Sequence, residues 1–329
     1  SNLDYIILII CRLASLSIWG AWFMYQEHFK LREAPFSLTP DPDYFYNYTG
    51  HQQALNVLLV ALQSGEGLIK ITGEVGTGKT LLCRKLLAVL SGDLQTAYLP
   101  NPLLKPFELY QALAEELGVS IPAGITMHDL VKRITEQLVG LRQKDKKVVL
   151  CIDEAQAMPQ ETLEALRLFS NLETEKQKLL QIVIFAQPEL NKMLESSDLR
   201  QLRQRITFSY DLPALDREAV TGYVHHRLKV AGHEDGKLFG RAALDAVYRS
   251  SRGIPRLVNI LCHKALMAAY GQGQSVVDLP QVKMASRDTE DATPLSMSLL
   301  AGKSFNFTIG IITLLEIILV IYLLRSVLS

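Results

Sequence analysis

Residues 67–80 read GLIKITGEVGTGKT, an apolar run followed by a glycine-rich loop and the start of a helical stretch. The loop fits the pattern G-x-x-x-x-G-K-S/T, in which glycines let backbone N–H groups converge on phosphate oxygens. A helix that begins near Lys79 adds its positive end to such a site. The predicted phosphate-binding residues are Gly73, Glu74, Val75, Gly76, Thr77, Gly78, Lys79 and Thr80. We expect Lys79 to reach the β- and γ-phosphates and Thr80 to offer a hydroxyl to Mg2+.

Around this loop, strand and helix patterns alternate. Apolar strand candidates lie at 67–72, 96–101, 148–153, 181–187 and 206–212, with helical stretches at 51–63, 79–90, 106–117, 126–142 and 159–173. This alternation predicts an α/β fold with a five-stranded parallel sheet covered by helices on both faces. After Pro213 only helical patterns follow, at 216–231, 240–251, 255–270 and 278–285, which predicts a small all-α lid domain.

Polar residues stand where two of these strands end. Asp153 closes the apolar run VVLCID and is placed to hold Mg2+, or else to cap the next helix. Glu154 follows it and is the candidate base that polarises the attacking water; the alternative is an ordinary solvated carboxylate. Gln187 ends the fourth strand and either positions that water or caps the helix after Pro188.

Two arginine positions extend the predicted site. LRQLRQRI at 199–206 carries Arg203 and Arg205, either of which is a candidate arginine finger for a neighbouring subunit. The same stretch could instead contact nucleic acid phosphates or form a solvated basic face. Arg256, in the segment Gly-Ile-Pro-Arg at a predicted helix start, is a candidate sensor that folds back onto the phosphates, because a cation there is unfavourable for the helix dipole.

Both ends of the chain are apolar. Residues 307–324 read FTIGIITLLEIILVIYLL, which predicts a C-terminal transmembrane helix over 305–325. Residues 1–23 have a marginal balance for membrane insertion, and the first methionine is Met24. We expect them to be an extension upstream of the natural start, with a membrane anchor as the alternative. The expected organisation is therefore an N-terminal extension at 1–23, a nucleotide-binding α/β domain at 24–213, a lid at 214–287, a linker at 288–304 and the membrane helix.

With 34 basic and 34 acidic residues, the chain has no net charge. A nucleic-acid-binding protein more often has a basic bias, so a nucleic acid partner is not expected from charge. The four cysteines are far apart and form no C-x-x-C pair, which argues against a metal or disulfide framework.

Taken together, these motifs resemble AAA+ ATPases, and within them the general secretion pathway protein A family (the ExeA or GspA type), with a layout similar to that of the MSHA pilus biogenesis ATPase MshM. The segments that carry the resemblance, over about 24–287, are Pro35-Phe36, Thr39-Pro40-Asp41-Pro42, GEVGTGKT, Asp153-Glu154-Ala155-Gln156, Gln187-Pro188-Glu189-Leu190 and Gly253-Ile254-Pro255-Arg256-Leu257-Val258-Asn259. In the secretion-pathway type a periplasmic region follows the membrane helix. Nothing follows Ser329 in this sequence.

The resemblance implies an enzyme that binds ATP and Mg2+, hydrolyses ATP and acts as a homo-oligomer. We expect it to couple nucleotide state to the assembly of a type IV pilus (MSHA-like) or a type II secretion machine, with membrane components of that machine as partners. The expected location is the cytoplasmic face of the bacterial inner membrane, with a single-pass C-terminal anchor. One alternative is a DNA-associated ATPase of the transposition or replication-initiation type. Another is a nucleotide-controlled scaffold that scarcely turns over.

Overall fold

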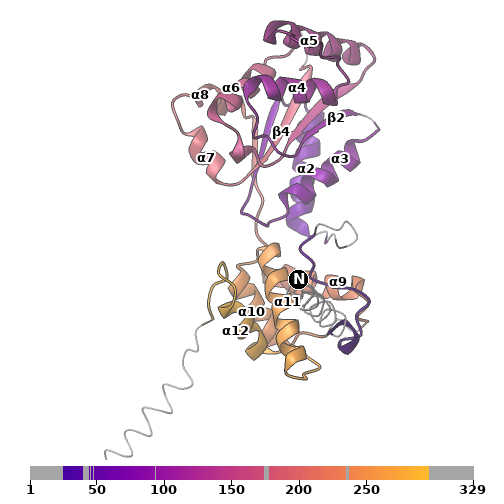
Figure 1. Cartoon of the computed structure of the whole chain (residues 1–329), viewed down its shortest axis with the longest axis vertical. Helices are drawn as coiled ribbons and strands as arrows, with labels where there is room; N and C mark the ends of the chain where they lie inside the picture. Colours follow the sequence, from indigo (N-terminus) through magenta and orange to yellow (C-terminus); the bar gives the residue numbers. More distant parts are fainter. Residues whose placement is uncertain are drawn as a thin grey trace, which may run out of the picture.

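A computed structural model describes residues 25–39, 44, 46, 48–92, 94–173, 178–234 and 237–295. In that range the chain forms an α/β part and a helical part, which lie one above the other in Figure 1. The connection between them runs from the end of the last strand to Leu215, whose N–H donates to the Gly253 carbonyl at 2.9 Å.

The α/β part is built on the expected five-stranded parallel sheet. Its strands are β1 (Leu68–Thr72), β2 (Leu94–Leu99), β3 (Lys147–Ile152), β4 (Leu180–Ala186) and β5 (Phe208–Asp211), in the order β2-β3-β4-β1-β5. All four neighbouring pairs are parallel. Strand β4 is buried along its whole length, as a continuous apolar run predicts for a strand covered on both faces. Strand β5 is at an edge of the sheet and is largely exposed.

Alternate strand residues point to opposite faces of the sheet and pack on different helices. Ile69, Ile71 and Phe185 face α2 (Thr49–Gln63) and α3 (Lys79–Leu90). Leu68 and Ile184 face the other side. That side is covered by α4 (Pro106–Glu116), α5 (Met127–Gln143), α6 (Gln160–Phe169), α7 (Glu189–Leu194) and α8 (Arg200–Arg205). The short helix α8 was not among the expected elements, because six residues give too little periodicity to identify it.

The helical part consists of α9 (Arg217–Val230), α10 (Arg241–Ser251), α11 (Pro255–Gly271) and α12 (Leu279–Arg287). Asp216 caps α9 by accepting a hydrogen bond from the Ala219 N–H at 2.8 Å. Pro255 stands in the first turn of α11, where its missing N–H costs nothing.

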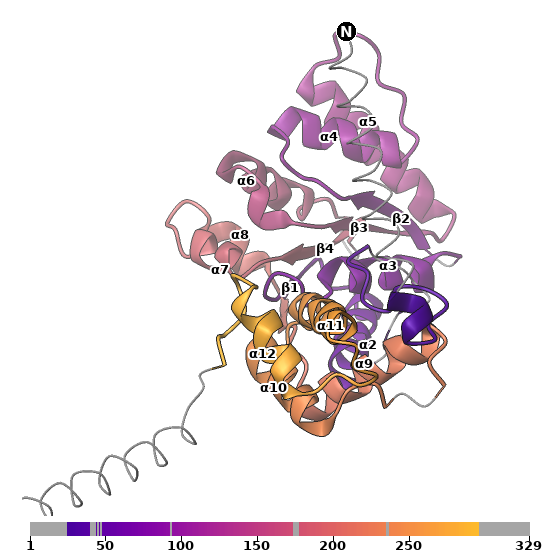
Figure 2. The ribbon, with the colours of Figure 1, turned by 60° about the horizontal axis from the view of Figure 1, so that its bottom comes forward.

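The N-terminal segment packs in the core of the helical part. Tyr25, Phe29 and Phe36 are buried with residues of α9, α10 and α11. In Figures 1 and 2 this indigo segment lies beside α9. The sequence predicts an α/β domain that begins at residue 24. In the structure, the first stretch of that range packs with the helical part instead.

The expectation of a C-terminal transmembrane helix has to be corrected. Among the described residues no helix is long and apolar enough to cross a membrane. The longest, α5 and α11, have 17 residues each and carry charged side chains, whereas a membrane span needs about 20 predominantly apolar residues. Segment 305–325 itself lies outside the described residues. The fold is therefore the α/β part with its helical part, and the single-pass anchor and the inner-membrane location inferred from it are not supported.

Candidate functional site

The glycine-rich loop between β1 and α3 adopts a conformation that only some residues tolerate. Gly76 and Gly78 have φ angles of 82° and 95°, in the left-handed region that favours glycine. Thr77 closes the turn, because its hydroxyl donates to the Glu74 carbonyl at 2.9 Å. The loop therefore has the strand-loop-helix context that its sequence pattern requires for phosphate binding.

Lys79 is buried at the first position of α3, with 4% of its surface exposed. Its Nζ donates to the carbonyls of Gly73 at 2.8 Å and Glu74 at 2.9 Å. Burial lowers the pKa of Lys79, and the nearby carboxylates of Glu154 and Asp153 oppose that shift. The ammonium group thus lies across the loop, where phosphate oxygens can replace the two carbonyls as acceptors.

The side chains of Asp153 and Thr80 are hydrogen-bonded to each other. Asp153 is 2% exposed, and burial raises the pKa of its carboxyl while a hydrogen bond from Thr80 opposes that shift. Within the described residues no group of three or more His, Cys, Asp or Glu side chains could hold a metal ion. One carboxylate and one hydroxyl nevertheless fit Mg2+, which usually takes one or two protein oxygens and completes its shell with water and substrate phosphates.

Two amide side chains hold Glu154. Its Oε2 accepts from Gln156 Nε2 at 2.5 Å and from Gln187 Nε2 at 3.1 Å. The Gln187 N–H in turn donates to Gln156 Oε1 at 2.9 Å. Glu154 has a φ of 53°, an unusual conformation for a residue with a side chain. Strands β3 and β4 are parallel neighbours in the sheet, so the residues that follow them lie side by side at the carboxyl ends of the strands.

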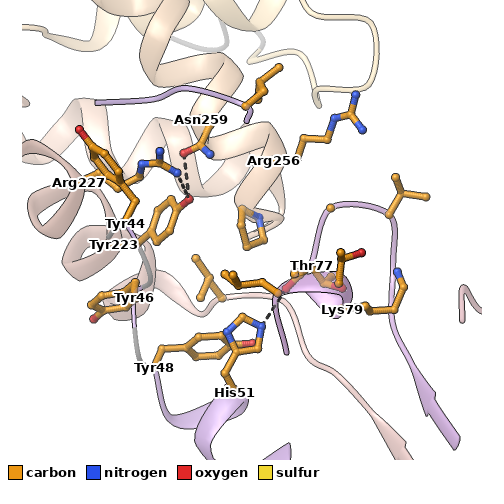
Figure 3. Close-up of a pocket in the computed structure, with 18 of the residues that line it drawn as sticks. Tyr44, Tyr46, Tyr48, His51, Thr77, Lys79, Tyr223, Arg227, Arg256 and Asn259 are labelled. Atoms are coloured by element: carbon orange, nitrogen blue, oxygen red, sulfur yellow. Dashed lines mark hydrogen bonds between the residues drawn. The ribbon is translucent and has the colours of Figure 1, made fainter. Parts of the chain in front are cut away.

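The helical part reaches the loop through the first turn of α11. The Arg256 N–H donates to the Gly76 carbonyl at 3.3 Å. A Cβ on Gly76 would lie 2.5 Å from the Arg256 Cβ, so the loop and the helix are in direct contact. In Figure 3 the Arg256 side chain stands on the lid side of the loop.

A cavity of about 410 Å3 extends from the loop into the helical part. Its far end is aromatic, with Tyr44 and Tyr46 from the N-terminal segment, and Tyr48 lies nearer the loop, beside His51 (Figure 3). Tyr223 donates from its hydroxyl to Asn259 Oδ1 at 3.0 Å, and Arg227 Nη1 donates to the Tyr223 hydroxyl at 2.9 Å. The cavity therefore has a polar, loop-lined end and an aromatic end.

Most of the predicted site residues line the cavity, whereas Gly73 and Glu74 of the loop, and Asp153 beside it, do not. Gly76, Lys79, Thr80, Glu154, Gln187 and Arg256 all line the cavity, together with Val75, Thr77 and Gly78. Arg203 and Arg205 do not line it and are exposed on α8.

Comparison with known proteins gives the relationship. A family model described as an AAA domain matches residues 62–194. The chain is 41% identical over 263 residues to general secretion pathway protein A of Aeromonas hydrophila, which covers 80% of this chain and 48% of the relative. The chain contains an AAA domain and is related to general secretion pathway protein A. It spans about half the length of that curated relative.

Solved structures share this fold at low sequence identity. The Cdc6p of Pyrobaculum aerophilum has a TM-score of 0.59 at 18% identity, covering 80% of this chain and 72% of that protein. The ORC2 protein of Aeropyrum pernix, solved with ADPNP and ADP, has a TM-score of 0.56 at 17% identity, covering 82% and 73%. These likenesses show the fold alone.

The sequence did not identify several residues of this site as functional. Gln156 holds Glu154, and its only signal was its place in the Asp-Glu-Ala-Gln box. The tyrosines at 44, 46 and 48 occur at every second position of an aromatic stretch, a spacing that could have marked one face of an extended segment. Arg227 had no signal, because its partners Pro35 and Tyr44 are far from it in sequence.

Proposed function

We propose that this AAA+ protein binds ATP in the cavity and hydrolyses it. The observation that carries the proposal is the arrangement of Glu154, which faces the same cavity as Lys79 and is held by the amides of Gln156 and Gln187. A carboxylate fixed in this way accepts a proton from water, while Gln187 orients that water.

The other residues have binding roles in this proposal. The loop N–H groups and Lys79 bind the β- and γ-phosphates, and Lys79 exchanges its two carbonyl partners for phosphate oxygens. Thr80 and Asp153 would hold Mg2+, which neutralises phosphate charge when it is bound. Arg256, beside Gly76, contacts the phosphates from the lid and couples nucleotide state to the position of the helical part. The aromatic end receives the base.

We further propose that the protein acts as a homo-oligomer in which Arg203 or Arg205 of one subunit serves the site of its neighbour. Both arginines are exposed on α8 and lie outside their own subunit's cavity. An arginine finger supplied in trans accounts for such a position.

The work that ATP performs is, in our proposal, the assembly of a secretion or pilus machine. Support comes from the relative named general secretion pathway protein A, at 41% identity. A type II secretion machine and an MSHA-like type IV pilus are the two candidate machines.

Two measurements test the proposal. Purified protein should release phosphate from ATP when Mg2+ is present and stop when it is chelated. Cells that lack the protein should lose secreted enzymes or surface pili, and wild-type protein should restore them while Glu154→Gln should not. Full restoration by Glu154→Gln would show that hydrolysis is not what the machine requires. Normal secretion and piliation without the protein would remove the assembly role.

A further inference from the structure

His51 lies directly against the phosphate-binding loop. It is in the first turn of α2, with 5% of its surface exposed. Its Nε2 is 3.1 Å from the Thr77 carbonyl oxygen, in a buried hydrogen bond (Figure 3). Since a carbonyl can only accept, Nε2 carries the proton and donates.

The imidazole also supports the loop sterically. A Cβ on Gly78 would lie 2.9 Å from His51 Cε1 and 3.0 Å from Nε2. Gly78 has a φ of 95°, so this position needs glycine for its conformation as well as for its space. The loop therefore lies on the histidine ring at the residue just before Lys79.

Tyr48 holds the ring from its other side. The two ring centroids are 4.6 Å apart, with an interplanar angle of 59°. The Tyr48 hydroxyl donates to the Pro213 carbonyl at 2.7 Å. Burial raises the pKa of Tyr48 to about 12, so the phenol keeps the proton that it donates. His51 is thus held between the loop and the connection that leads to the helical part.

The hydrogen bond from His51 to the Thr77 carbonyl fixes the orientation of the Thr77–Gly78 peptide plane. In a planar trans peptide the C=O and the following N–H point in opposite directions. With the Thr77 carbonyl bonded to His51, the Gly78 N–H points away from the histidine ring, and Gly78 is one of the residues that line the cavity. Glycine rotates readily, so without the histidine this peptide could turn and present its carbonyl oxygen to a phosphate.

We propose that His51 is a positioning residue for nucleotide binding: its Nε2–H fixes the Thr77–Gly78 peptide so that the loop offers an N–H, and not a carbonyl oxygen, to the nucleotide phosphates. The inference rests on the proposed function, because it assigns a role within the same nucleotide site. Burial lowers the pKa of His51 to about 4, which keeps the imidazole neutral at pH 7. His51 therefore acts through this hydrogen bond and not through charge.

The test compares two substitutions at this position. Gln places an amide nitrogen at the same distance along the side chain as Nε2, whereas Met has similar bulk and no donor. His51→Met should weaken ADP binding about tenfold, the equivalent of about 1.4 kcal/mol. His51→Gln should bind ADP within about threefold of wild type. Titration calorimetry gives the affinities, and thermal melts show whether the two variants are equally stable.

His263→Met is the matched control, because His263 is a partly buried histidine on α11 that lies against Tyr25 and outside the cavity. It should leave ADP affinity unchanged even if it lowers the melting temperature. Equal ADP affinity in wild type and His51→Met would overturn the inference alone, and so would an affinity of His51→Gln as weak as that of His51→Met. A wild-type protein that binds no nucleotide would overturn the proposed function together with the inference.

If His51→Met does not fold, the wild-type protein decides the question by NMR. The nitrogen shifts of the imidazole report which ring nitrogen carries the proton. An Nε2–H tautomer supports the inference, and an Nδ1–H tautomer overturns it.

Discussion

The phosphate end of the cavity and its aromatic end draw their side chains from different parts of the chain. At the phosphate end, Lys79, Asp153 and Gln187 each follow the carboxyl end of a strand in one sheet. At the aromatic end, Tyr44 and Tyr223 come from the N-terminal segment and from α9. The first end is therefore positioned by one rigid element, whereas the second depends on how two distant segments pack together.

This difference suggests a division of labour. Changes at the sheet side should affect phosphate binding and chemistry, whereas a change at Arg256 on the lid should affect how strongly ATP is distinguished from ADP. The following variants, from the largest expected effect to the smallest, test this division.

Lys79→Ala should abolish ATP binding, because it removes a buried ammonium group that donates two hydrogen bonds across the loop. A fluorescent ATP analogue should show no saturable binding to this variant. Lys85→Ala is the control, since Lys85 is an exposed lysine on the same helix. Retained affinity in Lys79→Ala would remove the loop from the nucleotide site.

Arg203→Ala or Arg205→Ala should lower turnover by about a thousandfold or more if that arginine is the finger. Mixing the inactive variant with Lys79→Ala subunits should restore part of the activity, because each subunit supplies what the other lacks. Arg200→Ala, at the start of the same exposed helix, should have little effect. Failure of every mixture to recover would argue against a site shared between subunits.

Protonation of His51 should lower the stability of the protein as the pH falls from 6.5 to 4. Burial lowers the pKa of His51 from 6.5 in the unfolded chain to about 4 in the folded protein. Between these two values the unfolded chain therefore binds a proton at His51 and the folded protein does not. The contribution is complete above pH 6.5 and is lost as the pH falls toward 4, by up to about 3 kcal/mol. Urea unfolding of wild type and His51→Met across this range should give slopes that differ. Parallel slopes would contradict the prediction, and exposed His128→Met is the control.

Glu154→Gln should lower ATP turnover by about a hundredfold and leave ATP affinity within about twofold. The amide keeps the size of the side chain and loses its basicity. Phosphate release and equilibrium binding measure the two effects separately. Glu161→Gln, an exposed carboxylate on α6, serves as the control. Unchanged turnover in Glu154→Gln would assign the base to another group.

Arg256→Ala should weaken ATP binding about tenfold and ADP binding much less, since its proposed contact is with the terminal phosphate. Comparing both nucleotides by calorimetry separates this lid effect from the loss of both affinities expected for Lys79→Ala. Arg241→Ala, an exposed arginine at the start of α10, should change neither affinity. Equal losses of ATP and ADP affinity would show that Arg256 acts like the loop residues on phosphates that both nucleotides share. The proposed difference between the sheet side and the lid side would then be weakened.

The sequence predicts the features that depend on local patterns and misses those that depend on contacts between distant segments. The loop at Gly73–Thr80 and Asp153 could be identified from the sequence as a candidate site, because phosphate and metal chemistry require local patterns at strand ends. The α/β fold followed from periodicity. Gln156 and His51 could not be assigned a role, since their partners Glu154 and Thr77 are recognised only from hydrogen bonds in the folded chain. The expected membrane helix came from apolar composition alone, which says nothing about packing.

The position of the N-terminal segment has a consequence for synthesis of the chain. Tyr25 packs on His263 and Phe36 on Phe239, so the ribosome makes the whole α/β part before these partners exist. At about 5–20 residues per second these aromatic side chains stay uncovered for tens of seconds. The α/β part can fold as it emerges, whereas the helical part closes last. Nascent chains halted before Pro213 should therefore bind chaperones through their first aromatic residues.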